Sequence, residues 1–127
     1  LLPPLDLDAA HPPWTLARAE AVVCCNMIHI APWAATEGLL AGAGTVLAPG
    51  SIPFLYGPFM RGGAHTAPSN AEFDASLRAR NPAWGVRDLE HVAASAGAAG
   101  LALRDIIGMP ANNLSVIFER QATFTPC

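Results

Sequence analysis

Charged residues are scarce in this 127-residue chain. Lys, Arg, Asp and Glu make up 13% of it, against about a quarter of an average soluble domain. The seven basic residues are scattered along the sequence, and the formal net charge is -3. Nucleic-acid binding depends on clustered Lys and Arg side chains that displace counterions from phosphates. We therefore expect no nucleic-acid partner, and we find no basic amphipathic stretch suited to a membrane surface.

Long apolar runs and cysteines are also scarce. No apolar run approaches the roughly 20 residues that span a bilayer, and the opening LLPP is unlike a targeting helix because proline does not build one. Three cysteines, with Cys24 next to Cys25, make neither a disulfide framework nor a CxxC metal site. We expect no metal site, no membrane association and a reducing, cytoplasmic location. Since the first residue is Leu1, we expect the chain to begin inside a longer gene product.

Hydrophobic residues, at 52%, are abundant and patterned. Residues 21–28 form a continuous apolar run, which is typical of a strand covered on both faces, with Cys24 and Cys25 as small core residues. Ser69 or Asn70 is placed to cap a later helix, and Gly100 to end another. Apolar spacing and the positions of Pro and Gly predict helices over residues 33–43, 72–80 and 86–99, and further strands over 52–56, 101–107 and 114–119.

The element order is strand, helix, strand, two helices, strand, strand. Alternation in the first part predicts an α/β fold. The turn at residues 110–113 is too short for a parallel crossover, so the last two strands must be antiparallel. Residues 121–127 are expected to form a tail.

Three local motifs stand out, namely LDA (7–9) followed by PW (13–14), EAVV (20–23) and GTVLAPG (44–50). In this order they resemble the acidic loop after the third strand, the start of the fourth strand and the turn before the fifth strand of the class I (Rossmann-like) S-adenosylmethionine-dependent methyltransferases. The resemblance implies a partial Rossmann-like methyltransferase sheet whose last strand is antiparallel. It predicts the spatial order first, second, fourth, third for the strands of this chain.

Longer strings are similar to one narrower branch. NMIHIAPW (26–33), FLYGPF (54–59), HTAPSNAEFDASLRARNPAWGVRDLE (65–90) and MPANNLS (109–115) resemble domain-of-unknown-function family nine hundred and thirty-eight. Residues 1–120 would then be the C-terminal half of a methyltransferase domain. The glycine-rich loop and the acidic residue that ends the second strand of the fold would precede Leu1. We therefore expect this chain alone to bind S-adenosylmethionine weakly or not at all.

The resemblance implies a set of cofactor contacts. Asp8 would accept a hydrogen bond from the adenine amino group, and Ala9 would supply a backbone contact. Asn26, Met27 and Ile28 would approach the methionine end of S-adenosylmethionine. The alternatives stay open at this point: Asp8 could be a solvated loop acid or a helix cap, and Met27 and Ile28 could be plain core residues.

Other polar residues are candidates for the methyl acceptor side, because ligands of open α/β sheets bind at the carboxyl ends of the strands. His29 and His65 are the candidate catalytic residues, His29 as a general base or as a structural histidine. We expect replacement of His29 by Ala to lower turnover more than stability. The candidate acceptor-binding residues lie at a strand end, in the following loop and in the last turn, and are Tyr56, Thr66, Asn70, Asn112 and Asn113.

Three functions are compatible with these features. The chain could be the acceptor-side half of a methyltransferase whose acceptor is a small molecule or a protein. It could be a truncated methyltransferase fold that serves as a binding or assembly module without a cofactor. Half of a Rossmann-like oxidoreductase ranks last, because such enzymes do not usually end in an antiparallel hairpin. An unpaired edge at residues 21–26 predicts a homodimer or pairing with a missing N-terminal half.

Overall fold

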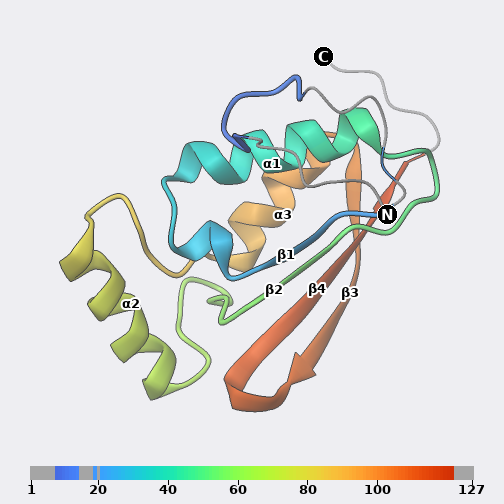
Figure 1. Ribbon diagram of the computed structural model, residues 1–127. Helices are drawn as coiled ribbons and strands as arrows, with labels where there is room; N and C mark the ends of the chain where they lie inside the picture. The colour runs from blue at the N-terminus through green and yellow to red at the C-terminus, as the bar shows by residue number, and fades with distance from the viewer. Residues whose placement is uncertain (1–7, 15–18, 20, 122–127) are drawn as a thin grey trace, which may run out of the picture.

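A computed structural model describes residues 8–14, 19 and 21–121. Its centre is one mixed sheet of four strands, seen in Figure 1. The strands are β1 (Val23–Cys25), β2 (Phe54–Gly57), β3 (Leu101–Met109) and β4 (Asn113–Arg120). The helices are α1 (Trp33–Val46), α2 (Pro68–Arg80) and α3 (Leu89–Ala98), with 3-10 turns η1 (Met27–His29) and η2 (Pro110–Asn112). Residues 1–7, including part of the LDA motif, lie outside the described residues.

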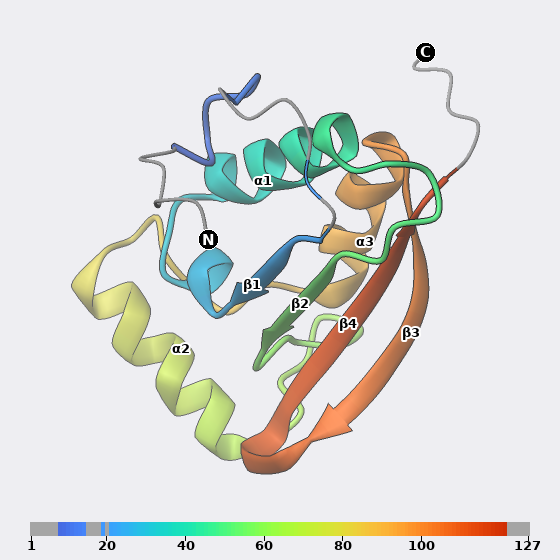
Figure 2. The ribbon, with the colours of Figure 1, turned by 45° about the vertical axis from the view of Figure 1, so that its right-hand side comes forward.

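The strand order is β1-β2-β4-β3, and Figure 2 shows β4 between β2 and β3. β1 and β2 are parallel, whereas β4 is antiparallel to both of its neighbours. The register pairs Cys24 with Leu55, and Leu55 with Val116. The predicted α/β class, the spatial order and the antiparallel last strand are therefore confirmed.

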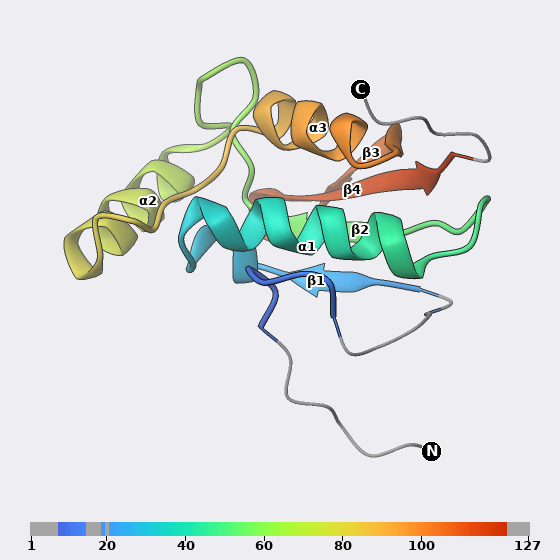
Figure 3. The same ribbon diagram turned by 90° about the horizontal axis from the view of Figure 1, so that it is seen from above.

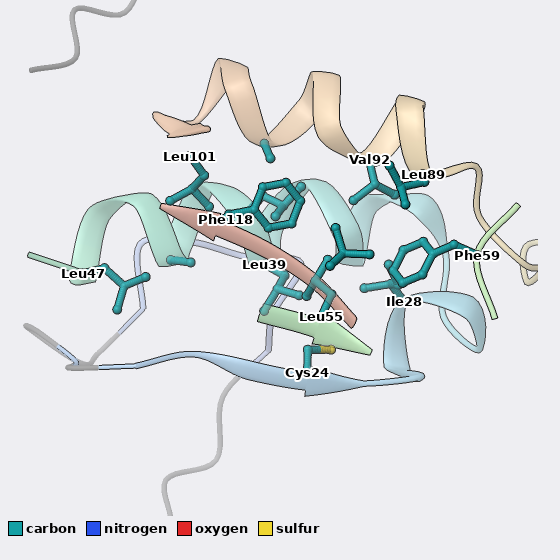
Figure 4. Packing of buried hydrophobic residues seen from close by; sticks show 14 of the residues in the cluster. Cys24, Ile28, Leu39, Leu47, Leu55, Phe59, Leu89, Val92, Leu101 and Phe118 are labelled. Atoms are coloured by element: carbon teal, nitrogen blue, oxygen red, sulfur yellow. The ribbon is translucent and has the colours of Figure 1, made fainter. Parts of the chain in front are cut away.

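Helices α1 and α3 cover one face of the sheet, and α2 lies beyond one end of it (Figure 3). The core lies between these two helices and the sheet, as Figure 4 shows. Phe59, Val92, Val116 and Phe118 are at most 1% exposed in it. Within the described part of the chain no helix covers the opposite face. Large hydrophobic side chains there stay exposed, among them Val23 at 58% and Ile107 at 43%.

β1 departs most from its prediction. It has three residues rather than the whole of 21–28, because Asn26 adopts a left-handed conformation (φ 65°) and η1 follows directly. Cys24 is buried in the core as expected, but Cys25 is exposed, so its assignment to the core is wrong. The reason is that the described helices cover one face of β1 only, and consecutive strand residues point to opposite faces.

The helix ends follow local chemistry, with one exception. The Asp88 side chain accepts a hydrogen bond from the backbone N–H of Glu90 and so caps α3. Gly100 follows α3 with φ 84°, as expected of a terminating glycine. α2 begins earlier than predicted, at Pro68, with Ala67 as its N-cap and no side-chain cap. The predicted cap at Ser69 or Asn70 is therefore wrong, because both residues lie inside the first turn.

Two glycines of α1 let the loop 8–14 lie directly on the helix. A β-carbon at Gly38 would overlap the carbonyl oxygen of Ala9, and one at Gly42 would overlap the indole ring of Trp14. The positions are four residues apart, so both face the same side of the helix. This close approach fixes the loop that carries Asp8.

Candidate functional site

The candidate site lies where β1 and β2 end. β1 leads into Asn26 and η1, and β2 ends at Gly57. α2 and the turn between β3 and β4 flank the same edge of the sheet (Figure 2). Carboxyl ends of parallel strands are the usual ligand edge of open α/β sheets. Two cavities open there, and both are lined in part by residues 26–32, which we call the wall segment.

The first cavity, the Asp8 cavity, has a volume of about 640 Å³. It brings together three predicted cofactor residues, Asp8, Ala9 and Met27. Small apolar residues from the start of α1 and its approach complete the lining, namely Ala10, Ala31, Pro32, Ala34 and Ala35. Ile28 does not join them. Its side chain is 2% exposed and belongs to the hydrophobic core, which supports the core alternative for this residue.

Asp8 is the charged group of this cavity. Its Oδ2 lies 2.7 Å from Nδ1 of His11, and its Oδ1 accepts a hydrogen bond of 3.0 Å from the backbone N–H of Ala10. The hydrogen bond from His11 and then that from Ala10 lower the pKa of Asp8 below its usual value. Asp8 is therefore a carboxylate near neutral pH, and it can accept a further hydrogen bond from a ligand. His11 was not identified from the sequence, although its spacing from Asp8 suits a turn.

The second cavity, the Asn70 cavity, has a volume of about 490 Å³. It brings together Asn70, Asn112 and Asn113, three of the predicted acceptor-binding residues, and adds Asn26, which was predicted on the cofactor side. The rest of the lining is apolar or small and consists of Ile30, Pro58, Ser69, Phe73 and Ala111. None of these lining residues carries a charge. Tyr56 and Thr66 lie outside this lining.

Asn70 links three elements around this cavity. It is only 4% exposed, and its Nδ2 donates to the Oγ1 of Thr66 at 3.1 Å and to the carbonyl oxygen of Asn112 at 3.0 Å. The second bond attaches the turn between β3 and β4 to α2. Ala111 and Asn112 hold φ values of 63° and 60° in that turn. Asn tolerates this left-handed conformation, as predicted for the turn, whereas Ala adopts it at a cost.

Arg87 fixes the wall segment from a distant part of the chain. Its Nε donates to the carbonyl oxygen of Ile28 at 3.0 Å, and its Nη2 donates to that of Ala31 at 2.6 Å. Its guanidinium also lies over the ring of Trp33, 5.6 Å from the centroid. Met27 lines the Asp8 cavity, whereas Asn26 and Ile30 line the Asn70 cavity. Arg87 thus fixes a segment that lines both cavities, and it was not identified from the sequence.

His29 belongs to the same wall segment and is fully buried. It is 0% exposed, its Nδ1 accepts a hydrogen bond from the backbone N–H of Arg87, and its ring makes a T-shaped contact with the ring of Phe59. Burial, and then the charge of Arg87, lower the pKa of His29 to about 4. Gly57 leaves room for the ring, since a β-carbon there would lie 2.5 Å from Nε2. The catalytic role of His29 stays a prediction, but this environment supports a structural histidine.

His65 and Tyr56 lie outside both cavities. Nε2 of His65 is 3.3 Å from Oδ2 of Asp74, whose other oxygen accepts hydrogen bonds from Arg78 and from the backbone N–H of Val86. Tyr56 sits on β2, paired with Cys25 and Ser115 on the uncovered face of the sheet. The catalytic role of His65 and the acceptor role of Tyr56 remain predictions.

The described residues contain neither a metal-binding cluster nor a membrane-spanning helix. No group of three or more His, Cys, Asp or Glu side chains there could hold a metal ion. No helix in the same part of the chain is long and apolar enough to cross a membrane.

Solved structures share this fold. A putative O-methyltransferase from Nostoc punctiforme PCC 73102 matches 87% of this chain with a TM-score of 0.73 at 18% identity, over 34% of its own length. Human N-acetylserotonin methyltransferase, solved in complex with S-adenosylmethionine, matches 90% with a TM-score of 0.71 at 14% identity, over 32% of its length. A structure described as a pericyclic reaction enzyme matches 88% with a TM-score of 0.71 at 15% identity, over 29% of its length. The chain therefore spans about a third of these relatives and shares a methyltransferase-like fold with them.

A family model gives a more specific match than these structures. The model described as "Protein of unknown function (DUF938)" matches residues 1–120. This range contains every string on which the narrower resemblance rested. The chain belongs to the DUF938 family, with a methyltransferase-like fold.

Proposed function

We propose that this chain is the acceptor-side half of an S-adenosylmethionine-dependent methyltransferase domain, with residues 1–120 as that half. One observation carries the proposal: an ionised Asp8 borders an apolar cavity whose wall also borders a second, amide-lined cavity. A methyl donor and a methyl acceptor need adjoining sites of this kind. A fold alone does not define a reaction, and the pericyclic enzyme among the structural relatives illustrates this point.

The residues of the Asp8 cavity fit the adenine end of the cofactor. Its lining of alanines, Met27 and Pro32 offers apolar contacts to a flat base. Asp8 can accept a hydrogen bond from an exocyclic amino group, and Ala9 lies in the same lining. When bound, S-adenosylmethionine supplies a methyl group that its sulfonium charge already activates. The task left to this chain is to orient donor and acceptor and to exclude water.

Binding by an Asp8 variant tests the proposal. We use the term full-length protein for this chain joined to the N-terminal half that the proposal requires. We would titrate S-adenosylmethionine into the full-length protein in a calorimeter, and then into its Asp8→Asn variant. Loss of a charged hydrogen-bond acceptor should weaken binding about tenfold or more. The matched control is Asp105→Asn, which changes an exposed carboxylate on β3 whose Oδ1 accepts a hydrogen bond from its neighbour Ile106. Equal affinity of the Asp8 variant and the unaltered protein would contradict the proposed site.

In the same proposal, the methyl acceptor is a small molecule or a protein. We place the protein in the cytoplasm, because Cys24 and Cys25 are both free thiols and reducing compartments favour that state. Cell fractionation with an antibody would test the location, and recovery in an oxidising compartment would refute it.

An assembly module without a cofactor is the second candidate. It is favoured by the apolar cavity of about 360 Å³ on the uncovered sheet face, lined by Ile52, Phe54, Ile107, Met109, Ser115 and Ile117. The calorimetric titration also separates the two candidates. A defined oligomer with no detectable binding of S-adenosylmethionine would favour the module.

A further inference from the structure

We infer that the Asn70 cavity takes an uncharged, ring-sized acceptor that donates one hydrogen bond to Oδ1 of Asn70. This inference rests on the proposed function and extends it by naming the chemical class of the methyl acceptor. Its basis is the donor and acceptor inventory of the cavity and the absence of charge from its lining.

The hydrogen-bond inventory starts at Asn70. A primary amide has two N–H donors and one carbonyl acceptor. Both donors of Asn70 are committed, one to Thr66 and one to the backbone carbonyl of Asn112. The Asn112 carbonyl can only accept, which fixes the orientation of the amide. Oδ1 receives no hydrogen bond from the described residues, although the residue is only 4% exposed. Oδ1 is not among the fully buried unpartnered atoms of the described residues, so solvent can reach it, and it can accept a hydrogen bond from a ligand O–H or N–H group, or from water.

The rest of the cavity sets the polarity and shape of the ligand. Ile30, Pro58 and Phe73 give it apolar walls. Its remaining polar side chains include Asn26 and Asn112, whose amides make no hydrogen bond within the described residues. Burying an ionised group without a partner of opposite charge is costly, and the nine lining residues offer none. Anionic and cationic ligands should therefore be excluded, whereas a neutral ring with one polar donor should fit.

Four small molecules that share a benzene ring test this inference. Phenol, anisole, benzoate and benzylamine share a ring but differ in donor capacity and charge. We would titrate each into full-length protein with nitrogen-15-labelled asparagine and follow the side-chain amide signals by NMR. Phenol should shift the Asn70 and Asn112 signals and bind at least fivefold more tightly than anisole. Benzoate and benzylamine should bind at least tenfold more weakly than phenol. Equal binding of anisole, or tight binding of either charged fragment, would overturn the inference.

Two variants separate recognition from structure. Asn70→Ala removes Oδ1 together with both bonds that Asn70 donates. Thr66→Val removes the bond to Thr66 but leaves Oδ1 in place. The preference for phenol over anisole should disappear in the first variant and persist in the second. If both variants lose it equally, Asn70 only holds the turn and the inference fails. Should Asn70→Ala not fold, the fragment series in the unaltered protein still decides.

The fragment assay contains no cofactor, so its outcome is independent of the calorimetric test at Asp8. Phenol binding at Asn70 without S-adenosylmethionine binding would support this cavity and refute the methyltransferase proposal. S-adenosylmethionine binding without any preference for phenol would do the reverse.

Discussion

Replacement of Gly38 by Ala should destabilise the folded protein, although Gly38 lies inside a helix. In the interior of α1, Ala would normally be favoured over Gly by about 1 kcal/mol because of its higher helix propensity. The new β-carbon, however, would overlap the carbonyl oxygen of Ala9 and lie 2.6 Å from the Cα of Ala10. Both obstacles are backbone atoms, so no side-chain rotation can relieve them.

The magnitude follows from two opposing effects. Overpacking of a tight contact costs about 1–3 kcal/mol, so the net change in the free energy of unfolding should be a loss of about 1 kcal/mol. Gly97 is the matched control: it lies in α3, and a β-carbon there would meet nothing within 4 Å. Gly97→Ala should stabilise the protein by about 0.4–1 kcal/mol. The two variants should therefore differ by roughly 2 kcal/mol.

Urea unfolding of full-length protein, followed by circular dichroism, measures this difference. Calorimetry with S-adenosylmethionine adds a second measurement, because the displaced backbone carries Asp8 and Ala9 into the Asp8 cavity. Gly38→Ala should weaken binding severalfold, and Gly97→Ala should leave it unchanged. If both variants gain the same stability and keep the same affinity, the loop does not rest on Gly38 and the reasoning is wrong.

Three further predictions follow from the pKa of His29, the cofactor contacts and the edge of the sheet. The pKa of His29 is about 4 in the folded protein and near 6.5 in the unfolded chain, so its contribution to stability is complete above pH 6.5 and is lost as the pH falls toward 4. Urea unfolding across this range should show the free energy of unfolding falling by roughly 3 kcal/mol, and His29→Gln should largely remove this loss. The 127-residue chain alone should bind S-adenosylmethionine weakly or not at all in a calorimeter, and saturable micromolar binding would contradict this. Light scattering should report self-association of the chain through residues 21–26, weakened by Val23→Lys; a clean monomer before substitution would refute it.

Local patterns were sufficient for much of the fold. The hairpin of β3 and β4 was predictable because a short turn forces antiparallel pairing, and Gly100 marked the end of α3. The actual length of β1 was not predictable, since it depends on a single left-handed residue, Asn26. The exposure of Cys25 could not be predicted from the apolar run either. A continuous apolar run says that both faces suit burial, but not whether the described chain supplies the cover.

The candidate site divides in the same way. Asp8, Ala9 and Met27 were identified because the motif resemblance places them, and the structure brings them to one cavity. Arg87 was not identified, because its bond to Ile28 joins residues 59 positions apart. Nothing in the local sequence around Arg87 marks that pairing. Contacts of this kind arise from the topology, and a single sequence carries no direct signal of them.

The wall segment lines both cavities, so the contacts that hold it in place affect both of them. Methyl transfer would need the reacting atoms in a direct line within about 3–3.5 Å of each other, so a segment that lines both cavities would have to keep a fixed position. A lone 3-10 turn is too short to be rigid by itself. Here Arg87 donates hydrogen bonds to two carbonyl oxygens of the wall segment, those of Ile28 and Ala31. The backbone N–H of Gly85 donates to the carbonyl oxygen of His29, and the ring of His29 fills the space above Gly57. The buried histidine and the distant arginine thus act on both cavities at once, and they do so without lining either of them.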